Sequence, residues 1–287
     1  MSSLKEIKER IASVRTTRKI TSAMKMVAAA KLHRAQRDMG ALVPYSERLR
    51  AIVGNLATGE GVGEIPLAVQ RTVERVTIVG FASNATLCGA YNSNVGRRVM
   101  SLLKDEYGSL EPENRRVVAM GRQLAAELQR GGVAHEKGDE HLAEHPDYQA
   151  YREMVEALAE EFLCGRTDRV VLVYYKFISP GVQTLVNETL LPIEIPAAKE
   201  QESAVEYILE PTREALIESI VPREVALRLF TAALSAVASE HMARMMAMQS
   251  ATDNADELIA SLSLEYNKQR QQAITTELLD MMGGQRE

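Results

Sequence analysis

The chain has 287 residues, of which 46% are hydrophobic and 25% are charged, which is an ordinary composition for a globular protein. This composition excludes a disordered chain, a collagen and a small disulfide scaffold. No stretch approaches the ~20 uninterrupted apolar residues that a membrane-spanning helix needs. The two cysteines, Cys88 and Cys164, form neither a disulfide framework nor a metal-ligand spacing, and they suit a reducing compartment.

The charge is unevenly distributed along the chain. Residues 1–50 hold 12 basic and 4 acidic residues (+8), residues 51–222 hold 16 and 26 (−10), and residues 223–287 hold 6 and 9 (−3). A basic first segment indicates a targeting peptide, a nucleic-acid arm or a face that meets an acidic partner. A secretory signal is excluded because there is no apolar core segment, and the early Glu6 and Glu9 argue against a transit peptide.

The first segment predicts one long helix, because no Gly follows Ser3 before Gly40 and no Pro precedes Pro44. Its apolar residues alternate in spacings of three and four, the pattern of a coiled-coil seam: Leu4, Ile7, Ile11, Val14, Ala28, Leu32, Ala35, Met39 and Leu42. The same register passes through Arg18, Thr21 and Lys25, so polar residues interrupt the stripe for about two turns.

The last segment predicts a second long helix, because neither Pro nor Gly occurs between Pro222 and Gly283. We expect Pro222 at or just before the first turn and Gly283 at the stop. The predicted seam consists of Leu227, Phe230, Leu234, Val237, His241, Arg244, Met248, Ala251, Ala255, Leu258 and Leu262. Here the polar pair His241 and Arg244 interrupts the stripe.

The simplest partner for the first helix is the last one, in an antiparallel pair whose opposite charges attract. The alternative is that each helix associates with another copy of the chain. If the two polar interruptions face each other, Leu4 lies at the level of Ile259 and Leu42 at the level of Val221. A second register would place Met24 opposite Thr275.

The middle of the chain alternates strand and helix patterns, which predicts a small sheet covered on both faces. Strands are expected at 73–82, 116–120, 169–177 and 183–191, and helices at 94–107, 123–129 and 147–163. The predicted fold class is therefore α/β plus a long antiparallel coiled coil of the terminal helices, with an inserted Rossmann-like α/β domain. The expected domains are 1–57 and 211–287 for the coiled-coil helices and 58–210 for the α/β part.

No catalytic or cofactor motif accompanies this architecture. Residues 80–89 contain neither G-x-G-x-x-G nor a Walker lysine, so a nucleotide site is not expected. Six metal-capable side chains gather within residues 135–145, namely His135, Glu136, Asp139, His141, Glu144 and His145, but the order H-E-x-x-H is absent. We expect this segment to be an exposed loop, Cys88 to be a small buried residue, and the chain to hold no cofactor and no metal.

Both terminal segments resemble the gamma subunit of the F-type ATP synthase. The first carries ITSAMKMVAAAK at residues 20–31, and the last carries SEHMARMMAMQSATDNA at 239–255 and YNKQRQQAITTE at 266–277. The resemblance covers the whole chain. It implies a rotor shaft inside a ring of three alpha and three beta subunits, with the α/β part as a foot on the membrane c-ring beside the epsilon subunit.

The resemblance also implies which residues meet these partners. The residues carried over to the beta subunit are Met24, Lys25, Arg244, Arg270, Gln271, Thr275 and Glu277. Those carried over to the c-ring and epsilon foot are Tyr207 and Glu210. The implied function couples proton or sodium flow to ATP synthesis without catalysis by this chain, at the cytoplasmic face of a bacterial inner membrane. Membrane contact would occur only through the c-ring, and no nucleic acid is involved.

Two departures from the family pattern stand out. The family usually reads S-D-R-G-L-C-G after its first strand, whereas residues 83–89 here read SNATLCG and lack the arginine. The family usually ends in a small apolar tail, whereas this chain ends in Gln285, Arg286 and Glu287. We therefore expect the polar contact of the loop and the apolar contact of the tail with the surrounding ring to be weaker or absent.

Two other classes of protein remain as alternatives. An α/β enzyme with dimerising helices would need a phosphate loop or a catalytic cluster. A nucleic-acid-binding coiled coil would need aromatic or glycine residues among the basic ones, and its net charge would not be acidic.

Overall fold

The computed structural model describes residues 4–57, 65–195, 209–210 and 212–283. The chain divides into two compact units. One, the helix-pair unit, consists of Met1–Ala29 and Arg244–Glu287, and the other, the α/β unit, consists of Ala30–Ala243.

Two very long helices contribute to both units. Helix α1 spans Leu4–Ala57 and helix α6 spans Arg213–Gly283. Each contains an internal proline, Pro44 in α1 and Pro222 in α6, which has no amide N–H for the helical hydrogen bond. The expectation that Pro222 opens the last helix was wrong, because α6 begins nine residues earlier at Arg213 and packing holds the turn around the proline. Val221, next to it, is only 3% exposed.

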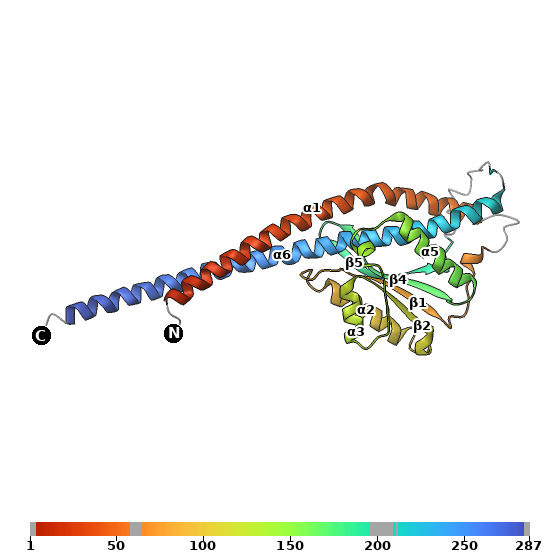
Figure 1. Ribbon diagram of the computed structural model, residues 1–287. Coiled ribbons are helices and arrows are strands. Elements are labelled where there is room, and N and C mark those ends of the chain that lie inside the picture. Colours follow the sequence, from red (N-terminus) through yellow and green to blue (C-terminus); the bar gives the residue numbers. More distant parts are fainter. Residues whose placement is uncertain (1–3, 58–64, 196–208, 211, 284–287) are drawn as a thin grey trace. The chain divides into compact units, whose positions relative to one another are not determined.

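In the helix-pair unit, α1 and α6 run antiparallel, as Figure 1 shows. Ile7 and Ile11 of α1 form a buried cluster with Leu262 of α6, flanked by Val14 and Tyr266. Ile7, Ile11 and Val14 are positions of the predicted apolar seam of α1. Burying each aliphatic side chain contributes roughly 1.5–3 kcal/mol. An intrachain pair of the two terminal helices is therefore present in this unit.

The predicted register of this pair was wrong. The Thr21 hydroxyl lies 2.9 Å from the Thr252 hydroxyl, whereas the predicted register placed Thr21 at the level of Met242. The difference of ten residues corresponds to about 15 Å along the helix. The second register, with Met24 opposite Thr275, was also wrong, because Lys25 reaches Gln249.

The predicted α6 seam is confirmed at eight of its eleven positions, which are buried: Leu227, Phe230, Leu234, Val237, His241, Met248, Ala255 and Leu262. Leu258, a predicted seam residue, is 44% exposed, whereas Thr252 is 8% exposed. The polar Thr252 can be buried because its hydroxyl is hydrogen-bonded, both to Thr21 of α1 and to the Met248 carbonyl.

The α/β unit contains a five-stranded sheet in the order β3-β2-β1-β4-β5. The strands are β1 (Val76–Phe81), β2 (Arg115–Met120), β3 (Glu136–Lys137), β4 (Arg169–Ser179) and β5 (Val182–Leu191). Strands β1 to β4 pair in parallel, and β5 pairs antiparallel with β4 through a tight turn at Gly181, which has a φ of 91°. This order confirms the predicted Rossmann-like α/β class.

Helices cover both faces of this sheet. Helices α2 (Tyr91–Asp105) and α3 (Arg122–Arg130) pack on one face, where Ile78, Val95 and Leu124 are completely buried. Helix α5 (Tyr148–Leu163) and the α/β-unit parts of α1 and α6 pack on the other face, around Val79, Tyr151 and Leu229. Two short 3-10 helices, Pro66–Ala68 and Pro112–Asn114, precede β1 and β2.

One expected loop contains secondary structure. Residues 131–147 include strand β3 and helix α4 (Glu140–Glu144). Strand β3 has only two residues and both are exposed, so no alternation of apolar and polar residues announces it. Asp139 caps the start of α4, and its carboxylate accepts hydrogen bonds from the amides of His141 and Leu142.

Candidate functional site

Paired side chains fill the polar interruption of the α1 seam. We call this set the polar layer: Arg18 with Asp256, Thr21 with Thr252, and Lys25 with Gln249. The two threonines are each 8% exposed, and the Arg18–Asp256 ion pair is half exposed. The interruption is therefore a matched contact between the helices.

The sequence could have indicated the α6 half of this layer. Gln249, Thr252 and Asp256 follow the same spacing of three and four as the polar residues of α1. The predicted interruption of α6 was instead at His241 and Arg244. His241 is buried in the α/β unit, 6% exposed.

The residues proposed to meet the beta subunit fall into two groups along the helix-pair unit. The first group is Met24, Lys25 and Arg244, all of which are half-buried. The Lys25 ammonium donates a 2.8 Å hydrogen bond to the Gln249 side-chain carbonyl.

The second group, Arg270, Gln271, Thr275 and Glu277, is exposed on α6. Because Thr21 faces Thr252, Leu4 lies at the level of Gln269, and this group lies at and beyond the described start of α1. Figure 1 shows the blue end of α6 continuing past the red start of α1. Thr275 lies about 39 Å along α6 from Gln249, the partner of Lys25, so the structure does not bring the two groups together.

The two foot residues differ in what the structure says of them. Tyr207 lies outside the described residues. Glu210 is exposed and comes three residues before the start of α6 at Arg213.

The loop after β1 is held by hydrogen bonds to its neighbours. The Asn84 side chain accepts from the Arg122 amide at 3.0 Å and donates to the Glu140 carbonyl at 2.6 Å. The Gln123 amide donates to the Ser83 carbonyl at 3.0 Å. These bonds use the first two amides of α3, which would otherwise be available to a phosphate group. Cys88 is 2% exposed, as expected for a small buried residue.

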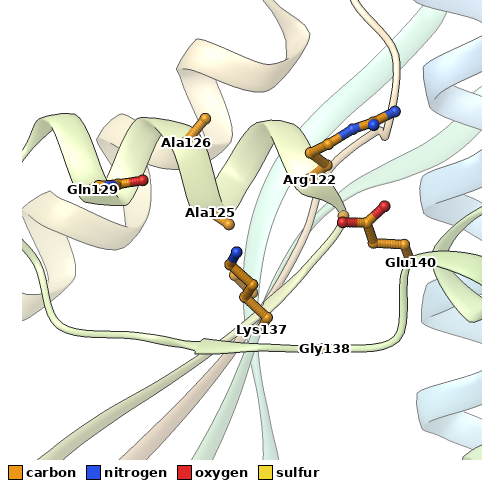
Figure 2. A pocket seen from close by; sticks show the side chains of 9 residues that line it. Arg122, Ala125, Ala126, Gln129, Lys137, Gly138 and Glu140 are labelled. Carbon is orange, nitrogen blue, oxygen red and sulfur yellow. The ribbon is translucent and has the colours of Figure 1, made fainter.

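A cavity of about 160 Å³ lies beside this loop, at the carboxyl ends of β2 and β3. Figure 2 shows Lys137 pointing from β3 toward α3, with Arg122 and Glu140 at the rim. Gly121 has a φ of 102° at the turn from β2 to α3, and the amide of Gly138 donates to the Ala119 carbonyl. This cavity offers two cations and no phosphate cradle.

The metal-capable side chains within residues 135–145 have contacts of their own and do not converge on one point. Asp139 caps α4, and Glu144 accepts a hydrogen bond from Lys31 of α1 at 3.2 Å. The Lys31 hydrogen bond is the main cause that lowers the pKa of Glu144. The rings of His141 and His145 lie 5.1 Å apart. Across the described residues, no three His, Cys, Asp or Glu side chains are placed to hold a metal ion.

A cavity of about 570 Å³ in the α/β unit is lined by residues of α1, β4, β5 and α6. On its floor, Glu188 accepts hydrogen bonds from the Tyr174 hydroxyl at 2.9 Å and the Lys176 ammonium at 3.0 Å. Burial alone would raise the pKa of Glu188, but these two hydrogen bonds lower it overall. Burial beside this carboxylate raises the pKa of Tyr174 well above its usual range, so its phenol stays neutral.

None of the helices in the described part of the chain is long and apolar enough to cross a membrane.

The comparisons with known proteins agree along the whole chain. The ATP synthase family model matches residues 3–286. The ATP synthase gamma chain of Phocaeicola vulgatus is 46% identical, with 99% of each chain covered. The chain belongs to the ATP synthase gamma-chain family. The gamma chain of Cytophaga hutchinsonii is 36% identical and covers 99% of this chain and 98% of its own.

Solved ATP synthase structures contain the same fold as this gamma-chain family member. A chain of the Euglena gracilis mitochondrial ATP synthase aligns with a TM-score of 0.66 at 19% identity, covering 98% of this chain and 93% of its own. A chain in the central stalk and c-ring structure of the Tetrahymena thermophila mitochondrial ATP synthase aligns with a TM-score of 0.58 at 19% identity, covering 81% and 99%.

Proposed function

We propose that this chain is the central rotor subunit of an F-type ATP synthase. In this role it couples rotation of a membrane c-ring, driven by proton or sodium flow, to conformational change at catalytic beta subunits. The helix-pair unit would turn within a ring of three alpha and three beta subunits. The observation that carries this proposal is an antiparallel pair with matched cross-helix contacts, from which α6 projects an exposed segment containing Arg270 and Gln271.

The proposed role of each segment follows the domains expected from the sequence. Residues 1–57 and 211–287 provide the coiled-coil helices, and residues 58–210 provide a foot that meets the c-ring and the epsilon subunit. Tyr207 and Glu210 are the proposed contacts of that foot.

We propose that the chain itself is not catalytic. The turn between β1 and α2, where a Rossmann-like fold would hold phosphate, lacks the glycine-rich motif, and the first two amides of α3 are already bonded to Asn84 and Ser83. The charged groups that line the cavity there are Arg122, Lys137 and Glu140, and the described residues of its lining include no serine, cysteine or histidine.

The proposed location is the cytoplasmic face of a bacterial inner membrane, where the chain is peripheral and touches the membrane only through the c-ring. The Phocaeicola and Cytophaga relatives are bacterial gamma chains, which supports this placement.

Arg270 and Gln271 provide the test of the proposed function. They are neighbours on α6, about 100° apart around its axis, so their side chains can reach different parts of a partner surface. Arg offers five donors and Gln both a donor and an acceptor, which suits a loop that carries carboxylates. Each hydrogen bond to a charged group is worth about 1.5–3 kcal/mol, enough to bias which beta conformation accompanies each rotor angle.

The experiment replaces both residues, Arg270→Ala with Gln271→Ala, in the reconstituted complete enzyme. We expect ATP turnover to fall by at least about tenfold while gel filtration shows an intact complex. The matched control is Gln129→Ala with Arg130→Ala, an exposed neighbouring pair on α3 of the α/β unit, which should leave turnover unchanged. Full turnover in an intact Arg270/Gln271 variant would reject the proposed contact.

A further inference from the structure

Two cations of α1, Arg18 and Lys25, emerge from the polar layer and each meets a side chain of α6. Arg18 forms an ion pair with the Asp256 carboxylate. Lys25 instead donates its 2.8 Å hydrogen bond to the neutral amide of Gln249. The two cations therefore have acceptors of different charge.

The Gln249 amide is fixed from both sides. Its carbonyl oxygen accepts from Lys25, and its nitrogen donates to the Asp253 carboxylate at 2.7 Å. Gln249 and Asp253 are four residues apart on α6 and therefore share one face of the helix. An amide has one accepting and one donating end, so these two partners set its orientation.

The partners of Arg18 and Lys25 therefore affect the charges of these two cations differently. Asp256 cancels the charge of Arg18 at short range, whereas Gln249 orients the Lys25 ammonium and leaves its charge in place. An ammonium has three donors, and Gln249 uses one of them. Lys25 is half-buried, so its head remains within reach of solvent.

We propose that Gln249 is a positioning residue for Lys25. It holds the ammonium at the surface of the helix pair, without neutralising it, for a carboxylate-bearing loop of a partner subunit. The identity of that partner rests on the proposed function, whereas the positioning itself belongs to this chain alone.

The first test measures positioning in the free full-length chain. The probe is the acylation rate of Lys25 with an N-hydroxysuccinimide acetate, read by peptide mass spectrometry. In Gln249→Glu the new carboxylate favours the charged ammonium, which does not acylate, so the rate should fall about two- to fivefold. In Gln249→Leu the acceptor is lost and the rate should rise.

The matched control is Gln269→Glu. Gln269 lies on the same helix, and its amide donates to Glu265 on α6 itself. Its replacement should leave Lys25 acylation unchanged. An unaltered Lys25 rate in both Gln249 variants, with circular dichroism showing intact helices, overturns the inference.

The second test measures ATP turnover of the reconstituted enzyme in a double-mutant cycle. Gln249→Glu should lower turnover as far as Lys25→Ala does, and the double variant should be no worse than either. Lowered turnover in Lys25→Ala together with full turnover in Gln249→Glu overturns the inference. If Lys25→Ala keeps full turnover, the proposed partner contact of Lys25 fails, and the acylation rates alone decide the positioning role.

Discussion

Two glutamates of the α/β unit show how local contacts set the charge of single residues. Glu224 of α6 is 3% exposed, and burial raises its pKa despite the nearby Arg228 and Arg50. The pKa of Glu188 is lowered, because hydrogen bonds from Lys176 and Tyr174 outweigh its burial. The ionised form of Glu224 is therefore disfavoured by folding, and that of Glu188 is favoured.

This contrast predicts a pH-dependent effect of Glu188→Gln. A carboxyl whose pKa is lower in the folded state stabilises the fold above its unfolded pKa of about 4.5, and this contribution is lost as pH falls through the folded value. The Glu188 side chain is 35% exposed, so solvent screening limits the effect to about 0.5–1 kcal/mol. Urea unfolding should show that loss at pH 7 and a smaller one at pH 3. An equal loss at both pH values would assign the effect to packing.

Gly121 provides a second prediction for a single residue. It joins β2 to α3 with a φ of 102°, and a Cβ there would lie 2.1 Å from the Ala82 carbonyl oxygen. Gly121→Ala should lower the free energy of unfolding by about 2–4 kcal/mol, from backbone strain and overpacking together. Gly132→Ala is the matched control, because Gly132 has a φ of 69° with no atom within 4 Å, so strain alone costs about 1–2 kcal/mol. Equal losses in the two variants would contradict the steric argument.

At the scale of elements, the register of α1 against α6 can be checked by a disulfide. Ile11 and Leu262 belong to one buried cluster, so Ile11→Cys with Leu262→Cys should cross-link readily under mild oxidation. Ile11→Cys with Thr252→Cys tests the register predicted from the sequence and should not. Both variants would carry Cys164→Ser, which removes the exposed native thiol. Efficient cross-linking of the second pair would contradict the observed register.

The elements show why some features of this fold could be predicted and others could not. The α1 seam was predicted because Ile7, Ile11 and Ala28 are apolar at regular spacing, and burial follows apolarity there. The α6 seam was predicted at most of its positions, but the buried Thr252 was missed because its partner Thr21 lies 231 positions away in the sequence. The start of α6 was misplaced because tertiary packing overrides the tendency of Pro222 to begin a helix.

In the candidate site, too, some features could be predicted from the sequence and others could not. The sequence predicted which residues would meet partners through a family resemblance, and the exposure of Arg270 and Gln271 is compatible with it. It did not indicate the role of Gln249, because an amide on a helix surface carries no pattern of its own. Its significance comes from the simultaneous contacts with Lys25 and Asp253.

At the scale of the whole molecule, we predict that the isolated chain does not bind ATP. The amides of Arg122 and Gln123 are occupied by Asn84 and Ser83, and the loop between β1 and α2 carries no phosphate-binding motif. Isothermal titration of ATP into the purified chain should give no heat of binding at micromolar concentrations. Binding in that range, removed by Arg122→Ala with Lys137→Ala, would instead assign a nucleotide site to the cavity of Figure 2.

The segment of α6 beyond the level of Leu4 has a mechanical consequence. Up to that level two helices are fastened together by the polar layer and the Ile7 cluster, whereas beyond it α6 continues to Gly283 as one helix. A single helix resists twisting less than a fastened pair, so a torque applied to its far end winds this segment first. The last four turns or so of α6 would then store angular strain as a torsion spring, and the paired segment would turn as a stiffer rod.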